Sequence, residues 1–335
     1  MMTSRISAAF VVSSVIATVS VAGQSPVPDT VEGHVAAARA AAGKDFTALF
    51  GLCEAPAPVQ PAPAAPARQA GPPPRENWQA KPVKVFDNLY FVGEQEYSAW
   101  AVTTSEGIII IDPIFDYSVE PQVVGGLRTL GLDPATIKYV LVSHAHYDHV
   151  GGAAFLQDRF NARVVISEAD WDLLSKTGGT WRKPKRDVVA TDGQKLTLGD
   201  TALTLHFTPG HTLGTISTLI PVKDGGRPHT AAYWGGTAFN WVRNRAGYIT
   251  PERPDSFWFD RYIASAQNFR NLAAAARADV ILSNHTNYDG SKAKLPAMAT
   301  RKPGDPHPYV VGPEAVARYL TVAEECAKAG TLRAR

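Results

Sequence analysis

Three histidines and one aspartate lie within six consecutive positions near the middle of the chain. They follow residues 139–142, an apolar run typical of a buried strand, and catalytic side chains concentrate in loops at the ends of such elements. His144 and His146 are two residues apart, so both imidazoles can point to one side and reach one metal ion. Asp148 and His149 lie on the turn beyond and can reach a second ion. Imidazole and carboxylate are the ligands that zinc accepts where thiolates are absent, so the run predicts a zinc site rather than a polar surface turn.

The spacing His144-x-His146-x-Asp148-His149 resembles the signature of the metallo-β-lactamase superfamily. This resemblance extends over roughly residues 84–288, and it directs attention to three more positions that follow expected strands. These positions are His211, His285 and Asp112, the last as a buried aspartate that braces the ligand loops.

The resemblance implies two zinc ions that share a reactive water, with three protein ligands for each ion. These ligands would be His144, His146 and His211 for the first ion, and Asp148, His149 and His285 for the second. Two ions at about 3.5–4 Å lower the pKa of the shared water toward about 7 and clamp the attacking and leaving groups. Asp148 is also expected to orient the attacking water, which would make it a catalytic residue as well as a ligand.

The positions Gly236 and Thr237 discriminate among members of the superfamily. Its thioesterases carry a bridging Asp in this region, and another lactamase subclass carries a Cys, whereas this chain has neither. The ligand set is therefore most similar to subclass 3 of the class B metallo-β-lactamases. This implies a hydrolase that opens the amide of β-lactam antibiotics with a zinc-bound hydroxide, and hence antibiotic resistance. That subclass typically has Ser here, so substrate contacts should differ, and the candidates are Thr237, Tyr97 and Trp241.

Other functions stay open at this stage. The same fold carries lactonases, thioesterases and phosphodiesterases, so fold alone does not decide the chemistry. A nucleic-acid-processing enzyme would need a basic surface, but the chain has 33 basic and 31 acidic residues and a net charge of +2, so no nucleic-acid partner is expected. A metal-binding protein without catalysis is a third alternative, and six intact ligands argue against it. The expected partner is a small-molecule substrate, and the oligomeric state is not predicted.

Strands and helices alternate along residues 78–335, which we expect to form the catalytic domain. Apolar and alternating runs predict strands at 84–92 (a pair), 99–103, 107–111, 139–142, 163–166, 195–198, 203–207, 215–220, 231–234 and 280–283, and helices at 31–52, 119–130, 153–159, 168–175, 256–276 and 313–329. Two strand-rich halves that divide near Asp187, each with outer helices, predict an α+β sandwich of two sheets flanked by helices. The resemblance implies the same architecture, a four-layer αββα sandwich.

The first 22 residues are typical of a signal peptide. Arg5 supplies a positive charge, residues 6–21 are mostly apolar, and Ser20 and Ala22 fit the small-residue cleavage pattern. The apolar run is short for a membrane-spanning helix, and a retained anchor or a core helix is the alternative. We therefore expect export to the periplasm or the medium, with no stable membrane insertion after cleavage. Residues 23–77 should then form an N-terminal helix and a Pro- and Ala-rich tether.

The chain has two cysteines, Cys53 and Cys326, and neither has a C-x-x-C partner. In an oxidising compartment they can pair and tie the N-terminal segment to the last helix, and two unrelated thiols are the alternative. Of the remaining histidines, His34 is expected to face solvent and His206 to be structural, and His229 and His307 are expected to be uninvolved loop residues.

Overall fold

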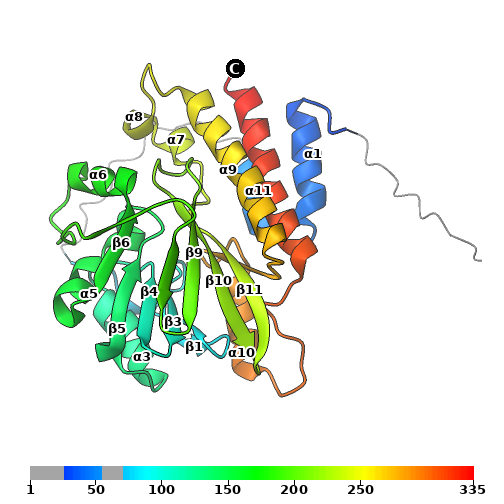
Figure 1. Ribbon diagram of the computed structural model, residues 1–335. Helices are drawn as coiled ribbons and strands as arrows, with labels where there is room; N and C mark the ends of the chain where they lie inside the picture. Colours follow the sequence, from blue (N-terminus) through cyan, green and yellow to red (C-terminus); the bar gives the residue numbers. More distant parts are fainter. Residues whose placement is uncertain (1–25, 55–70) are drawn as a thin grey trace, which may run out of the picture.

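The computed structural model describes residues 26–54 and 71–335. Within them, two β-sheets pack face to face, and helices cover the two outer faces (Figure 1). The first sheet has seven strands in the order β1 to β7, and the second has five strands in the order β12-β11-β10-β9-β8. The protein is thus a four-layer αββα sandwich, which confirms the expected fold class.

The first sheet changes from antiparallel to parallel pairing at β4. Strands β1 to β4 pair antiparallel, whereas β4 to β7 pair parallel, and their crossovers carry helices on the outer face. Strand β4 has four consecutive isoleucines that are all buried, as expected for a strand covered on both faces. The strands are β1 (Val83–Lys84), β2 (Leu89–Phe91), β3 (Trp100–Thr104), β4 (Gly107–Ile111), β5 (Ile137–Leu141), β6 (Arg163–Ser167) and β7 (Val188–Ala190).

The second sheet is antiparallel from β8 to β11, and β12 adds to β11 in parallel. Its inner face packs against the first sheet, and this interface forms one of three buried apolar clusters. The strands are β8 (Lys195–Leu198), β9 (Thr201–Phe207), β10 (Ile216–Asp224), β11 (Arg227–Trp234) and β12 (Val280–Ser283).

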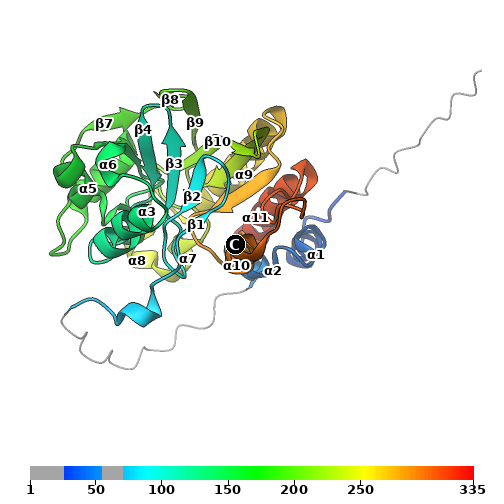
Figure 2. The same ribbon diagram turned by 90° about the horizontal axis from the view of Figure 1, so that it is seen from below.

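The helices divide between the two outer faces (Figures 1 and 2). On the first sheet, helix packing creates a second apolar cluster, and on the second sheet it creates a third. The helices over the first sheet are α3 (Gly125–Thr129), α5 (Ala153–Phe160) and α6 (Glu168–Lys176), and those over the second are α1 (Val31–Ala42), α9 (Asp255–Ala275) and α11 (Pro313–Arg333). The shorter ones are α2 (Thr47–Phe50), α4 (Tyr147–Val150), α7 (Asn240–Arg243), α8 (Arg245–Tyr248) and α10 (Ser291–Thr300), with the 3-10 turns η1 (Gly51–Cys53), η2 (Arg75–Asn77) and η4 (Pro134–Thr136).

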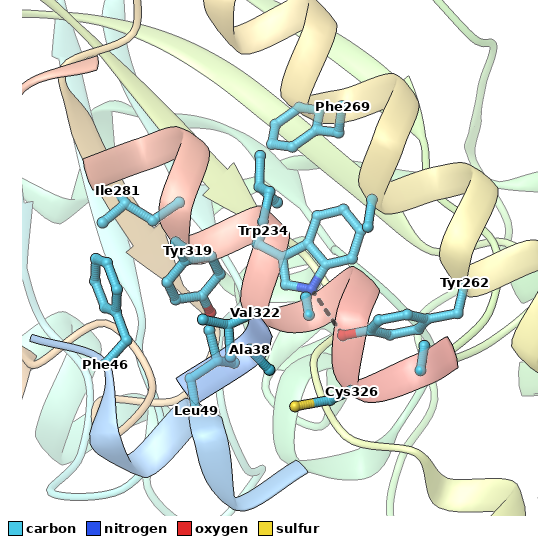
Figure 3. Close-up of a cluster of buried hydrophobic side chains, with 14 of the residues drawn as sticks. Ala38, Phe46, Leu49, Trp234, Tyr262, Phe269, Ile281, Tyr319, Val322 and Cys326 are labelled. Carbon is cyan, nitrogen blue, oxygen red and sulfur yellow. Dashed lines mark hydrogen bonds between the residues drawn. The ribbon is translucent and has the colours of Figure 1, made fainter. Parts of the chain in front are cut away.

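The N-terminal segment is packed into the third cluster. Figure 3 shows Phe46 and Leu49 against Tyr319 of α11, and all three side chains are buried. The segment is also held covalently, because Cys53 and Cys326 form a disulfide. Of the two alternatives that the sequence leaves open, the structure thus has the pairing, and it ties the end of the N-terminal segment to the last helix.

Replacing Cys53 and Cys326 together with Ser should lower the free energy of unfolding by about 3–5 kcal/mol. The disulfide closes a loop with a sequence separation of 273, and its removal increases the entropy of the unfolded chain. Denaturant midpoints of both proteins, with and without a thiol reductant, measure this effect. The reductant should shift only the native protein, and equal midpoints for the two oxidised proteins would show that the crosslink contributes nothing.

Several expected elements have different bounds in the structure. The helix expected at 31–52 breaks at Gly43, where φ is +54°, and continues as two short turns. The helix expected at 119–130 begins as a π-helical turn, η3 (Val119–Val124), before α3. The expected division near Asp187 is wrong by one strand, since β7 follows it and still pairs with β6.

The expectation for His34 is also wrong in part. Its side chain is 5% exposed, because α1 lies against α11. The ring nitrogens of His34 lie 2.6 Å from a Glu325 carboxylate oxygen and 3.2 Å from Asp29. His34 therefore fixes the N-terminal helix rather than facing solvent.

No helix among the described residues is both long and apolar enough to cross a membrane. The expected signal peptide and most of the Pro- and Ala-rich tether fall in residues 1–25 and 55–70, outside the described residues.

Candidate metal centre

The predicted ligands meet at one edge of the sandwich because they follow the ends of several strands. Strand β5 ends at Leu141, and the chain then turns through His144 and His146 into α4. His211 follows β9, and His285 follows β12. The strand ends of both sheets thus bring residues from three separate segments into one centre.

The first cluster contains His144, His146 and His211, whose candidate ligand atoms lie within 4.8 Å of one another. His211 Nε2 is 3.1 Å from His144 Nε2 and 3.1 Å from His146 Nδ1. Burial is the main cause that lowers the pKa of all three rings, to about 4 for His146, and the neighbouring imidazoles lower those of His144 and His211 further. Three neutral imidazoles therefore point their nitrogens at a common point, as a divalent metal ion requires.

The second cluster contains Asp148, His149 and His285 within the same 4.8 Å limit. One Asp148 oxygen lies 3.1 Å from His149 Nε2 and 3.6 Å from His285 Nε2. Neither ring nitrogen of the fully buried His149 has a partner in hydrogen-bond geometry. A buried nitrogen that faces a carboxylate without such a bond fits a metal ligand better than a hydrogen-bonded pair.

Charges around the second cluster favour a cation. Burial alone would lower the pKa of His149, but Asp148 and Asp112 outweigh it and raise the pKa to about 10. Burial acts to raise the pKa of Asp148, but the neighbouring histidines outweigh it and lower this pKa well below its usual range. The two carboxylates thus stabilise positive charge at this position, which a divalent ion would supply.

Outer contacts hold the rings of the first cluster. His144 Nδ1 lies 2.9 Å from the Gly235 carbonyl oxygen, and His211 Nδ1 lies 2.7 Å from that of Ala238. With a proton on Nδ1, each ring donates outward and turns the lone pair of Nε2 into the cluster. His146 has the opposite orientation, because its Nδ1 faces the cluster and its Nε2 lies 2.9 Å from the Tyr248 hydroxyl oxygen.

Asp112 connects the two ligand loops from behind, as expected from the sequence. It follows β4 and is fully buried. It accepts hydrogen bonds from the backbone N–H of Ser143 at 2.6 Å and from the hydroxyl of Tyr233 at 2.5 Å. One of its oxygens lies 3.1 Å from Nδ1 of His149. The carboxylate therefore positions the turn that carries His144 and the ring of His149.

Sequence reasoning missed a second buried carboxylate, Asp170 of α6. It accepts the backbone N–H of Ala145 at 2.7 Å, the Thr212 hydroxyl at 2.9 Å and the Gly214 N–H at 2.9 Å. Burial raises the pKa of Asp170 to about 6 despite these bonds. Asp170 links the loop of His144 and His146 to the loop of His211, and no local motif marks it.

Tyr248, at the end of α8, was also missed, and its removal has a measurable consequence. Tyr248→Phe should weaken metal binding at the first cluster by about 10- to 100-fold, because His146 loses the partner that fixes its ring. The Phe variant keeps the ring that packs on Trp258, at a centroid distance of 5.1 Å. Competition with a chromophoric chelator measures the affinity, and an unchanged value would rule out this role.

Two of the three expected substrate contacts are wrong. The side chains of Thr237 and Trp241 are each 0% exposed. Thr237 lies within hydrogen-bond distance of Ser283 at 3.2 Å, and Trp241 packs on Phe259 in the third apolar cluster. Tyr97 is half-buried, and its ring centroid is 5.1 Å from that of His285, so it does border the centre.

The other histidines have structural surroundings, as expected. His206 is buried near Phe269, and His307 stacks on Phe86 at a centroid distance of 4.2 Å. His229 lies 2.6 Å from an Asp279 oxygen. None of the three lies in either histidine cluster of the described residues.

Comparison with known proteins agrees with this geometry. The family model of the metallo-beta-lactamase superfamily matches residues 92–226. Over this range, the chain is similar to the metallo-beta-lactamase superfamily. Among solved structures, BJP-1, a subclass B3 metallo-beta-lactamase of Bradyrhizobium japonicum, is 29% identical with a TM-score of 0.62 and covers 74% of this chain and 92% of its own.

Two curated relatives of this chain are named for substrates other than β-lactams. The hydroxyacylglutathione hydrolase of Acidiphilium cryptum is 29% identical over 36% of this chain and 43% of its own length. The N-acyl homoserine lactonase AttM of Azorhizobium caulinodans is 26% identical over 52% of this chain and 67% of its own. The chain spans about half the length of the hydroxyacylglutathione hydrolases that it matches. The family match and the two histidine clusters together support a metal-dependent enzyme.

Proposed function

We propose that this protein is a β-lactamase of the subclass B3 type, which opens the β-lactam amide with two zinc ions held by the two clusters. The observation that carries the proposal is the position of Gly236, where a thioesterase of this superfamily would need its bridging carboxylate. A Cβ atom at Gly236 would lie 2.6 Å from His211 Cβ and 2.9 Å from Thr215 Cγ2. Any side chain here would displace a metal-ligating histidine, so the site is built without the extra carboxylate.

The neighbouring position supports the same conclusion. The Thr237 side chain is fully buried and lies against Ser283 and Asn284, so it does not reach between the clusters. The three-His plus Asp-His-His set is thus the full set of ligands that the described residues offer at this centre. This set is the one that the resemblance to subclass 3 implies.

The candidate metal ligands differ in how far they are exposed to a substrate. Two bound zinc ions would activate a water molecule and polarise the scissile carbonyl. All six residues would hold the ions. His144, His149 and His211 are buried, whereas His146, Asp148 and His285 are partly exposed and can face a substrate. The Asp148 side chain is 25% exposed, so its carboxylate can accept a hydrogen bond from the attacking water and orient it.

The test is hydrolysis of a carbapenem and of a chromogenic cephalosporin by metal-free and zinc-loaded protein. Zinc should restore turnover of both compounds, and a chelator should remove it. A His229→Ala variant is the matched control, since this histidine lies outside both clusters. Turnover of a glutathione thioester or an acyl homoserine lactone, with no β-lactam opening by the zinc-loaded protein, would overturn the proposal and favour the chemistry for which the curated relatives are named.

We further propose that the protein is exported to the periplasm or the medium. The Cys53–Cys326 disulfide supports this, because such bonds persist in oxidising compartments. Fractionation of cells that express the full chain tests the proposal, and a reduced protein in the cytoplasmic fraction would contradict it.

A further inference from the structure

A small cavity of about 200 Å³ lies beside the metal centre and has no part in the chemistry described above. Four aromatic and two acidic side chains form most of its wall. They are Trp78, Tyr97, Phe115, Tyr117, Glu94 and Glu96.

The aromatic wall is held by ring contacts. Phe115 and Tyr117 stack with centroids 5.0 Å apart and an interplanar angle of 14°. Tyr97 meets Phe115 edge to face at 4.9 Å, and Trp78 meets Tyr117 at 5.8 Å. The faces of such rings carry partial negative charge and attract cations. Arg75 already lies over Trp78, with its guanidinium carbon 5.9 Å from the ring centroid.

Glu94 adds a buried carboxylate without a full set of partners. The residue is 1% exposed, and its Oε1 atom has no hydrogen-bond partner. Burial raises the pKa of Glu94 to about 7, Ser118 opposes this through a hydrogen bond, and Asp148 adds to the rise. Glu96 differs, because it already pairs with Lys292. A buried carboxylate oxygen that lacks a partner is costly, and a bound cation would stabilise its negative charge even without donating a hydrogen bond.

Tyr97 links this cavity to the metal centre. Its ring borders the cavity on one side, and its centroid lies 5.1 Å from that of His285 and 6.4 Å from that of His149. The cavity and the metal centre therefore lie on two sides of one residue, Tyr97.

We infer that this cavity is a subsite for a cationic group, a primary or quaternary ammonium, carried by the substrate. Aromatic faces and a nearby carboxylate are the combination that recognises ammonium groups. As a substrate subsite it rests on the proposed hydrolase function, and it narrows the substrate to molecules with a positively charged arm. Binding of the cation itself does not depend on that function.

The first experiment measures binding without turnover. Tetramethylammonium is titrated into the zinc-loaded full chain, with calorimetry and tryptophan fluorescence as readouts. Glu94→Gln should weaken binding at least 10-fold, whereas Glu106→Gln, a change at the exposed turn between β3 and β4, should leave it unchanged. Tyr117→Leu should also weaken binding, and Tyr117→Phe should retain it because the aromatic face is kept. If tetramethylammonium does not bind the native chain, or binds the Glu94→Gln variant equally, the inference is wrong.

The second experiment uses two β-lactams that differ only in a free or an acetylated amine on the side arm. Glu94→Gln should raise KM at least 5-fold for the amine and leave its kcat and both constants for the acetylated compound unchanged. Equal effects on the two compounds would overturn the inference. Ammonium binding that depends on Glu94, together with no β-lactam turnover, would instead overturn the proposed function and leave the cation site in place.

Discussion

Asp148→Asn should lower kcat/KM for hydrolysis by about 100- to 10,000-fold, the range in which a residue that handles a proton contributes. The substitution keeps the shape of the side chain and removes its charge. Asp148 lies 3.1 Å from His149 Nε2 and 3.6 Å from His285 Nε2, so loss of its charge should weaken the second cluster as a metal site. An amide oxygen is a weaker metal ligand than a carboxylate. The zinc content after dialysis should therefore fall from two ions per chain toward one.

Two companion variants separate loss of metal from loss of orientation. His149→Ala removes a ligand without touching the carboxylate, and it should lose the second ion at least as completely as Asp148→Asn. Asp158→Asn, in a surface pair with Arg182, is the control and should keep both metal and rate. Excess zinc can refill both sites of the Asp148→Asn variant. If its hydrolysis is still slow under these conditions, the carboxylate orients the attacking water. Two tightly bound ions and full activity in His149→Ala would contradict the ligand assignment.

The ligands could be predicted from the sequence because each follows a strand whose apolar pattern is visible locally. His144 and His146 share one strand end, and the chain order of the motifs matches the order of the strands. Tyr248 and Asp170 had no such signal. Tyr248 lies 102 residues from His146, and Asp170 lies 25 residues from Ala145, so their contacts exist only once the loops have packed.

The elements that were missed are those in which local pattern and tertiary structure disagree. Strand β7 has only three residues and is defined by its pairing with β6 at the edge of the sheet. Helix α10 contains Pro296, which disfavours a helix interior because it lacks a backbone N–H. The sequence places Trp241 near a site loop, where an aromatic side chain can face either the substrate or the core. Its burial against Phe259 follows from α7 lying on α9, which no short-range pattern encodes.

Asp112→Ala should lower the free energy of unfolding of the metal-free protein by about 3–5 kcal/mol. This is the range expected when a buried charged side chain is removed and its partners stay behind. The change leaves three donors without their buried acceptor. In the native protein, the Ser143 N–H, the Ser143 hydroxyl and the Tyr233 hydroxyl lie 2.6, 2.6 and 2.5 Å from the Asp112 carboxylate oxygens. Unfolding by urea in the presence of a chelator measures stability apart from metal binding. It also separates this role of Asp112 from its contact with His149.

Tyr233→Phe provides the matched test, because it removes one of these donors and keeps the ring. If the hydroxyl is costly only when unpaired, Tyr233→Phe should recover part of the stability lost in Asp112→Ala, and the double variant should lose less than the sum of the single changes. Strict additivity would mean that the two side chains act independently. Zinc affinity should fall in Asp112→Ala and persist in Tyr233→Phe, since only Asp112 touches the ring of a ligand, His149.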